Sequence, residues 1–130
     1  MFFEFDIRTD SENFHNITGC VKEAVKKSGV KNGICIVYSP HTTGGITINE
    51  AADPDVVDDM IYAFDKIFPD MEEFKHYEGN SSAHIKTSLV GNSETVIVED
   101  GNLLLGTWQG IYFTEFDGPR RRKFYVKVLG

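Results

Sequence analysis

The strongest constraint on the fold is the run of strand-forming sequence over residues 94–128, where β-branched and aromatic residues dominate. Only two turn signals interrupt it, at residues 100–102 and 117–119, and both combine aspartate and glycine as hairpin turns do. Alternation or continuity of apolar residues predicts three shorter strands, at residues 3–7, 34–38 and 46–48. The chain is therefore predicted to be a mixture of strands and helices, with strands dominating its last third.

A first helix is predicted over residues 12–28. Thr9 and Glu12 have the spacing of a capping box, in which two side chains satisfy the amides at a helix start. Apolar residues then recur at helical intervals until Gly29, which is typical of a helix end.

Two further helices are predicted in the middle of the chain. Asp53 can accept the unpaired amides of a helix start, and Pro54 suits the first helical position, so a helix is expected from there to Pro69. A polar loop then leads into a short third helix, which Ser81 or Ser82 is expected to cap.

Composition and net charge limit the kinds of partner and function that the chain can have. The chain has 130 residues, of which 41% are hydrophobic, so one packed domain spanning residues 1–130 is expected. Its net charge of -7 disfavours nucleic acid and anionic membrane surfaces as partners. No apolar run approaches the length of a membrane span and no secretory signal is recognisable, so a cytoplasmic protein that acts on small molecules is expected.

Three histidines lie in turns rich in small and polar residues, where core packing gives little reason for an imidazole: His41, His76 and His84. Neutral imidazoles are good ligands for a zinc-like cation, and three of them leave a coordination position open for water or substrate. The eight-residue interval between His76 and His84 is no diagnostic metal spacing. The histidines either share one cation or make hydrogen bonds in separate turns.

Carboxylates and uncharged donors accompany these histidines. Glu50 and Glu78 are candidates for a general base or for a group that orients a ligand, although either can also be a solvated surface carboxylate. The candidate phosphate-binding donors in the same segments are Thr42, Thr43, Asn49, Asn80 and Ser81. The last two lead into a helix N-terminus, which favours anions.

Three of the chain's four arginines are consecutive. In extended chain Arg120 and Arg122 point to one side and Arg121 to the other, so Arg120 and Arg122 are candidates for binding one phosphate. Subunit contacts or internal ion pairs are the alternative roles. Gln109 lies between Trp108 and a glycine, which allows it to approach a ligand, whereas the indole is expected to serve packing.

Five ordered motifs give the chain a resemblance to a known family: SPHTTGGITINE (39–50), DPD (53–55), HYEGNSSAHIK (76–86), GTWQG (106–110) and EFDGPRRR (115–122). The chain resembles the YjbQ-type family, many members of which carry the name secondary thiamine-phosphate synthase. The resemblance runs over nearly the whole chain.

The resemblance implies an α+β fold, mainly an antiparallel sheet in a sandwich or barrel-like core with about three helices. It also implies a homotrimer with sites near subunit boundaries and a divalent metal held by His41, His76 and His84, with zinc foremost and magnesium where a diphosphate is the substrate.

The implied reaction condenses a hydroxymethylpyrimidine diphosphate with a thiazole phosphate and releases pyrophosphate. On that hypothesis Thr42, Asn80, Ser81 and Arg120 cradle phosphate. A metal-dependent hydrolase of a small phosphorylated metabolite and a non-enzymatic trimer that binds a metabolite or metal are the two alternatives.

Overall fold

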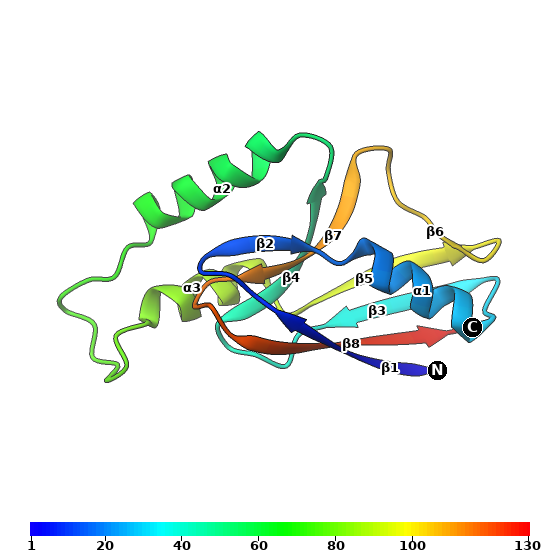
Figure 1. Ribbon diagram of the computed structural model, residues 1–130, viewed down its shortest axis with the longest axis horizontal. Coiled ribbons are helices and arrows are strands. Elements are labelled where there is room, and N and C mark those ends of the chain that lie inside the picture. The colour runs from blue at the N-terminus through cyan, green and yellow to red at the C-terminus, as the bar shows by residue number, and fades with distance from the viewer.

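The computed structural model describes residues 1–130, which form two antiparallel sheets and three helices (Figure 1). The strands are β1 (Phe2–Arg8), β2 (Asn13–Asn16), β3 (Gly33–Tyr38), β4 (Gly44–Glu50), β5 (Ser93–Glu99), β6 (Asn102–Leu103), β7 (Gln109–Glu115) and β8 (Arg121–Leu129). The helices are α1 (Thr18–Ser28), α2 (Pro54–Ile67) and α3 (Ser81–Val90). None of them combines the length and the apolarity that a bilayer crossing needs.

The strands divide into a five-stranded sheet, in the order β1-β8-β3-β5-β6, and a three-stranded sheet, in the order β2-β7-β4. Every neighbouring pair is antiparallel, which confirms the predicted α+β fold with a mainly antiparallel sheet. Both termini lie at the same end of the molecule (Figure 1), where the amino group of Met1 donates to the carbonyl of Val128 at 2.7 Å.

The main hydrophobic core lies between the two sheets and is closed by α1. Its buried residues come from α1 and its approach, from β3, β5 and β8 of one sheet, and from β4 and β7 of the other. Strand alternation accounts for this, because β8 buries every second residue from Arg122 to Val128. A smaller cluster around Phe14, Tyr112 and Phe116 packs α2 and α3 against the three-stranded sheet.

The predicted first helix begins later than its pattern suggested. Residues 12–28 do not form one helix, since Asn13–Asn16 is strand β2 and α1 begins at Thr18. Thr9 caps no helix; its hydroxyl donates to Glu115 and accepts the amide of Arg120. Strand pairing with the edge of β7 outweighs the local pattern here, because it buries Phe14 and places it opposite Thr114.

The other two predicted helices form where expected. Asp53 accepts the amide of Asp55 at 2.9 Å and Pro54 is the first residue of α2, as predicted. The residue before α3 is Asn80 rather than a serine, and its side chain makes no capping bond. Ser82 instead donates to the carbonyl of Phe68, which ties α3 to the end of α2.

A buried ion pair joins the two sheets where the chain passes from β7 to β8. Glu115 has no exposed side-chain surface, and Arg122 is 5% exposed. The Nε of Arg122 donates to Oε1 of Glu115 at 2.7 Å, and its Nη2 donates to Oγ1 of Thr43 at 2.9 Å. The second carboxylate oxygen accepts the amide of Asp117 at 2.9 Å. Four segments of the chain therefore meet at this ion pair: the end of β7, the start of β8, Thr43 before β4 and Thr9 just after β1.

Hydrogen bonding, more than burial, sets the charge state of this carboxylate. Burial alone would raise the pKa of Glu115, but the hydrogen bonds from Arg122 and Thr9 outweigh it and hold the pKa below its ordinary value. Glu115 is therefore ionised at neutral pH, and so is its arginine partner.

Replacing Glu115 with glutamine should lower the free energy of unfolding by about 3–5 kcal/mol, because the buried guanidinium of Arg122 then lacks a counter-charge. Urea unfolding of the purified variant measures this change. Lys27→Ala is the control, because it breaks only the exposed ion pair with Glu23 and should change the free energy of unfolding far less. Equal losses in the two variants would contradict a structural role for the buried pair.

Candidate functional site

A pocket of about 360 Å³ lies where the turn between β3 and β4 meets α3. Two of the predicted histidines, His41 from the turn and His84 from the helix, contribute to its wall. The remaining lining residues are Tyr38, Ser39, Pro40, Thr42, Thr87, Ser88 and Asn92. Hydroxyl, amide and imidazole groups thus dominate the surface, which suits a small polar ligand.

The turn that carries His41 is held by hydrogen bonds within and behind it. The buried hydroxyl of Ser39 donates to the carbonyl of Gly44 at 2.6 Å, which closes the turn. The side-chain amide of Asn92, just after α3, donates to the carbonyls of Ser39 and His41 at 3.0 and 2.7 Å. The turn is therefore fixed relative to α3 before any ligand binds.

His41 is half-buried, and its surroundings favour the neutral form of its imidazole. Its Nε2 accepts the backbone amide of Lys123 at 2.9 Å, which places the ring proton on Nδ1. Burial lowers the pKa of His41 below its ordinary 6.5, and the nearby positive charge of Arg122 lowers it further. The imidazole therefore stays uncharged at neutral pH, with one nitrogen already occupied by protein.

His76 and His84 lie together although the chain between them turns into a helix. His76 lies in the loop after α2, and its ring centroid is 5.3 Å from that of His84, with the planes at 87°. Two imidazoles on one tetrahedral zinc, with Zn–N bonds of about 2.0–2.1 Å, have ring centroids roughly 5 Å apart. The spacing of this pair therefore fits a shared metal ion.

The structure does not gather three metal-binding side chains around one point within a single chain. His41 shares the pocket with His84, but its Nε2 is bonded to Lys123. Of the predicted ligand set, His76 and His84 form the pair that suits a metal. Of this pair only His84 lines the pocket, and His41 contributes to the same wall as a hydrogen-bonding group.

Thr87 is the lining residue of the pocket whose side-chain oxygen is buried without a hydrogen-bond partner. It is 2% exposed, and its Oγ1 has no hydrogen-bond partner. Burying a hydroxyl without a partner is costly, so native proteins rarely keep one without a reason. Because Thr87 lines the same pocket as His41 and His84, a ligand there is its natural partner.

Two predicted phosphate-binding residues meet on a shared carboxylate. Asn80 Nδ2 and Arg120 Nη2 both donate to Oδ2 of Asp117, at 2.7 and 3.0 Å. Glu78 lines a neighbouring hollow together with Asn80 and Asp117, and Ser81 opens α3 beside them. These groups form a second cluster, next to α3 but not among the residues that line the histidine pocket.

Three predicted residues lie at the opposite end of β4. Glu50 faces Gln109 across β4 and β7, and Asn49 precedes Glu50. Figure 1 shows β4 running from the α3 end of the molecule to the start of α2. Since a strand advances about 3.3 Å per residue, Glu50 lies roughly 20 Å along the strand from Gly44. One chain therefore does not bring them to the histidine pocket.

The remaining predicted donors divide between surface and interior. Thr42 is exposed and lines the histidine pocket. Thr43 and Arg122 are buried and bonded to each other, so both belong to the ion pair that joins the sheets. Their hydrogen bonds are directed inward, away from any ligand in this pocket.

Sequence reasoning missed Thr87, Ser88 and Asn92. The first two follow His84 by three and four residues in α3, so they occupy its face of the helix. That periodicity was the available signal for Thr87 and Ser88. Asn92 acts after the helix has ended, and no local pattern distinguishes it.

The fold and the site together define an α+β protein of two antiparallel sheets with a histidine-lined pocket beside a short helix. The family model described as UPF0047 protein YjbQ-like matches residues 3–130. The chain belongs to this YjbQ-like UPF0047 family, as its motifs indicated.

Relatives and solved structures agree with this membership. A UPF0047 protein of Methanocaldococcus jannaschii is 55% identical, covering 100% of this chain and 95% of its own length. The UPF0047 protein YugU of Bacillus subtilis is 52% identical over 94% of this chain and 93% of its own. A crystal structure of an uncharacterised YjbQ/UPF0047 protein from Clostridium acetobutylicum has a TM-score of 0.96 at 56% identity, covering 98% of this chain and 99% of that one.

The imidazole of His41 should titrate with a midpoint below pH 6.5, because its burial favours the neutral form. Two-dimensional NMR of the ring protons measures the midpoint directly. The folded state then binds fewer protons than the unfolded state, so His41 makes stability fall as pH decreases through 6.5. Stability at pH 5 should therefore drop less in a His41→Gln variant than in the parent, and a His41 midpoint above 6.5 would contradict the assignment.

Proposed function

We propose that the histidine pocket binds a divalent metal, zinc foremost, together with a small phosphorylated metabolite. The observation that carries the proposal is the convergence of the His76–His84 pair and the unpartnered hydroxyl of Thr87 beside one pocket. The imidazole pair suits a soft or borderline cation, and the hydroxyl suits an oxygen-rich ligand.

The side chains around the pocket favour an oxygen-rich ligand. The part of α3 that lines it runs from His84 to Ser88, and Asn92 follows just after the helix. Thr42, Thr87 and Ser88 add hydroxyl donors from two sides. With magnesium bound in place of zinc, the same surface would hold a diphosphate through its oxygens.

The activity proposed first is the condensation that the resemblance implies, in which a pyrimidine diphosphate and a thiazole phosphate give thiamine phosphate and pyrophosphate. A divalent metal would supply positive charge for the departing diphosphate. The residues of this chain bind and orient: Thr42 and Thr87 hold ligand oxygens, His41 donates one hydrogen bond from Nδ1, and Glu78 is the carboxylate on the α3 side.

We propose further that the chain assembles as the expected homotrimer, with the pocket near a subunit boundary. The outer face of the five-stranded sheet supports this, because large apolar side chains are exposed on it: Phe2, Ile34, Tyr38, Ile97 and Leu129. Tyr38 also lines the histidine pocket, so a subunit packed on this face would reach the pocket rim. In such a trimer, a histidine pocket could be completed by three residues of a neighbouring subunit: Glu50, Asn49 and Gln109.

Replacing His84 with alanine should remove one stoichiometric zinc per chain, because His76 alone leaves a single imidazole. Elemental analysis after zinc loading and dialysis measures the loss, and circular dichroism checks the fold. His15→Ala serves as the control, since His15 lies on β2 and lines none of the pocket. Full zinc content in His84→Ala would refute the metal assignment.

Incubating the zinc-loaded protein with hydroxymethylpyrimidine diphosphate, with and without thiazole phosphate, separates the three functions. Thiamine phosphate and pyrophosphate in the paired reaction support the condensation. Release of phosphate from the diphosphate alone supports the hydrolase, and tight binding without turnover supports the non-enzymatic protein.

Replacing Thr87 with valine should raise the free energy of unfolding by roughly 1 kcal/mol while it weakens ligand binding. The substitution keeps the shape and removes a buried hydroxyl that has no partner in the free protein. Thermal unfolding with and without the diphosphate measures both effects. Thr95→Val, on an exposed strand position, should change neither by much. A destabilised Thr87→Val variant with unchanged binding would count against the proposed role.

A further inference from the structure

All four arginines of this chain gather at one corner of the five-stranded sheet, and the structure gives them different partners. Arg122 is buried against Glu115, and Arg120 is bonded to Asp117. Arg8 and Arg121 are exposed, and their side chains make no ion pair and no hydrogen bond. This is notable in a chain with 20 acidic and 13 basic residues, where carboxylate partners are plentiful.

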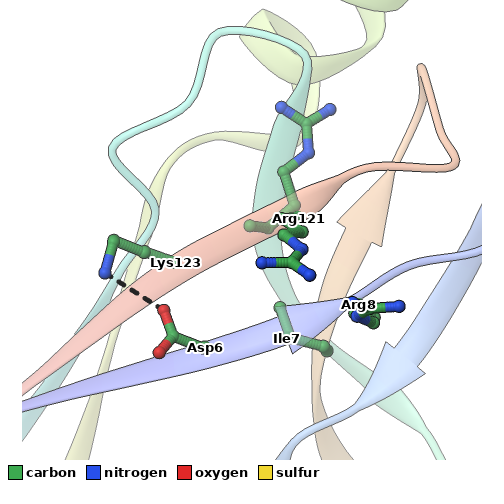
Figure 2. A pocket seen from close by; sticks show the side chains of 6 residues that line it. Asp6, Ile7, Arg8, Arg121 and Lys123 are labelled. Carbon is green, nitrogen blue, oxygen red and sulfur yellow. Dashed lines mark hydrogen bonds and ion pairs between the residues drawn. The ribbon is translucent and has the colours of Figure 1, made fainter.

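Arg8 and Arg121 face each other directly across β1 and β8. Directly opposed residues of antiparallel strands have Cβ atoms about 4.5–5.5 Å apart, and like charges at that spacing destabilise the pair. The next pair on the same face is complementary, because the Nζ of Lys123 lies 3.1 Å from Oδ1 of Asp6. Figure 2 shows this contact as a dashed line, with Arg121 and Arg8 on the neighbouring stretch of the two strands.

A hollow of about 460 Å³ lies over these residues. Its lining consists of Asp6, Ile7, Arg8, Arg121, Arg122 and Lys123. A second hollow of about 310 Å³ shares Arg8 and Arg121 and continues to Thr9 and Arg120. The two unpartnered guanidinium groups therefore stand between two depressions, where a ligand can reach both of them.

We propose that Arg8 and Arg121 form a binding site for a small oxyanion with two or more negative charges, a phosphate or a carboxylate compound. Guanidinium groups bind the oxygens of both classes in paired hydrogen bonds, and one polyvalent anion between them neutralises their repulsion. Lys123, the lysine beside this site on β8, already forms ion pairs with Glu4 and Asp6. The net charge of -7 disfavours a nucleic-acid backbone as the occupant.

This site adjoins the proposed metal and metabolite pocket, because the amide of Lys123 donates to His41, but the two do not share lining residues. Its side chains come from β1 and β8, and none of them lines the pocket of His41 and His84. Binding here requires no metal, so it can be tested on metal-free protein. Failure of either proposal leaves the other standing.

Calorimetric titration of the metal-free protein with inorganic pyrophosphate and, separately, with citrate tests the site at low salt. Binding of one anion per chain is expected, and Arg8→Gln and Arg121→Gln should each weaken it at least tenfold. The tighter of the two anions identifies the class, and either result supports the site. Lys127→Gln is the matched control, because it removes one exposed positive charge from the same strand about 20 Å away and should change affinity less than twofold.

Equal weakening in Arg121→Gln and Lys127→Gln would overturn the proposal, since it would reduce the effect to overall charge. Absence of binding by both anions would overturn it as well. A second readout is the melting temperature without anion, which should rise in Arg8→Gln as the repulsion is relieved. Sedimentation gives the third: a changed oligomeric state in either arginine variant would show that the pair contacts another subunit instead.

Discussion

The buried pair of Glu115 and Arg122 is the interaction on which the arrangement of this protein depends. The two residues belong to different sheets, and the carboxylate and the guanidinium satisfy each other far from solvent. Through Thr43 the pair also reaches the segment before β4, and the amide of Phe116 donates to the carbonyl of Thr43 at 3.1 Å. A charge pair at this depth persists only where its hydrogen-bonding geometry is satisfied, so it fixes how the sheets meet.

The histidine pocket is built directly on that fixed corner. His41 lies two residues before Thr43, and the amide of Lys123 that bonds to His41 follows Arg122 in β8. The opposite wall is α3, which packs against β4 and carries His84 and Thr87 on one face. His41 lies in a turn that hydrogen bonds from Ser39 and Asn92 hold in place, whereas His76 lies in the exposed loop after α2, beside His84. The pocket thus has firmly held walls, and the metal-binding pair includes one histidine from an exposed loop.

Local pattern predicted the parts of the molecule in which one face meets the core. The alternation of Phe3, Phe5 and Ile7, the strands after residue 94 and the start of α2 at Asp53 and Pro54 all follow from periods or caps that neighbouring residues define. Strand β2 was mistaken for helix because its four residues are defined by pairing with β7, which lies about 100 residues later. No local pattern contains that pairing.

The sequence identified the kinds of side chain that form the site, but not the full set of residues that meet there. Alternation correctly separated Arg121 from Arg122, which shares the buried face of β8, but the partner of Arg122, Glu115, comes from the other sheet. His76 and His84 were recognised from their unusual setting, and the structure brings them together. Glu50, Asn49 and Gln109 were grouped with them on chemistry alone, and the direction of β4 separates them. Sequence shows which side chains are reactive, and long-range topology decides which of them meet.

Anomalous diffraction from crystals grown with zinc would show whether metal and ligand bind where His76, His84 and Thr87 lie. We expect a zinc peak between the rings of His76 and His84, with one nitrogen of each at roughly 2.0–2.1 Å from the metal. Density for bound ligand or water beside the hydroxyl of Thr87 would accompany it. A zinc ion bound only elsewhere on the protein, with His76 and His84 unligated, would rule out the metal site.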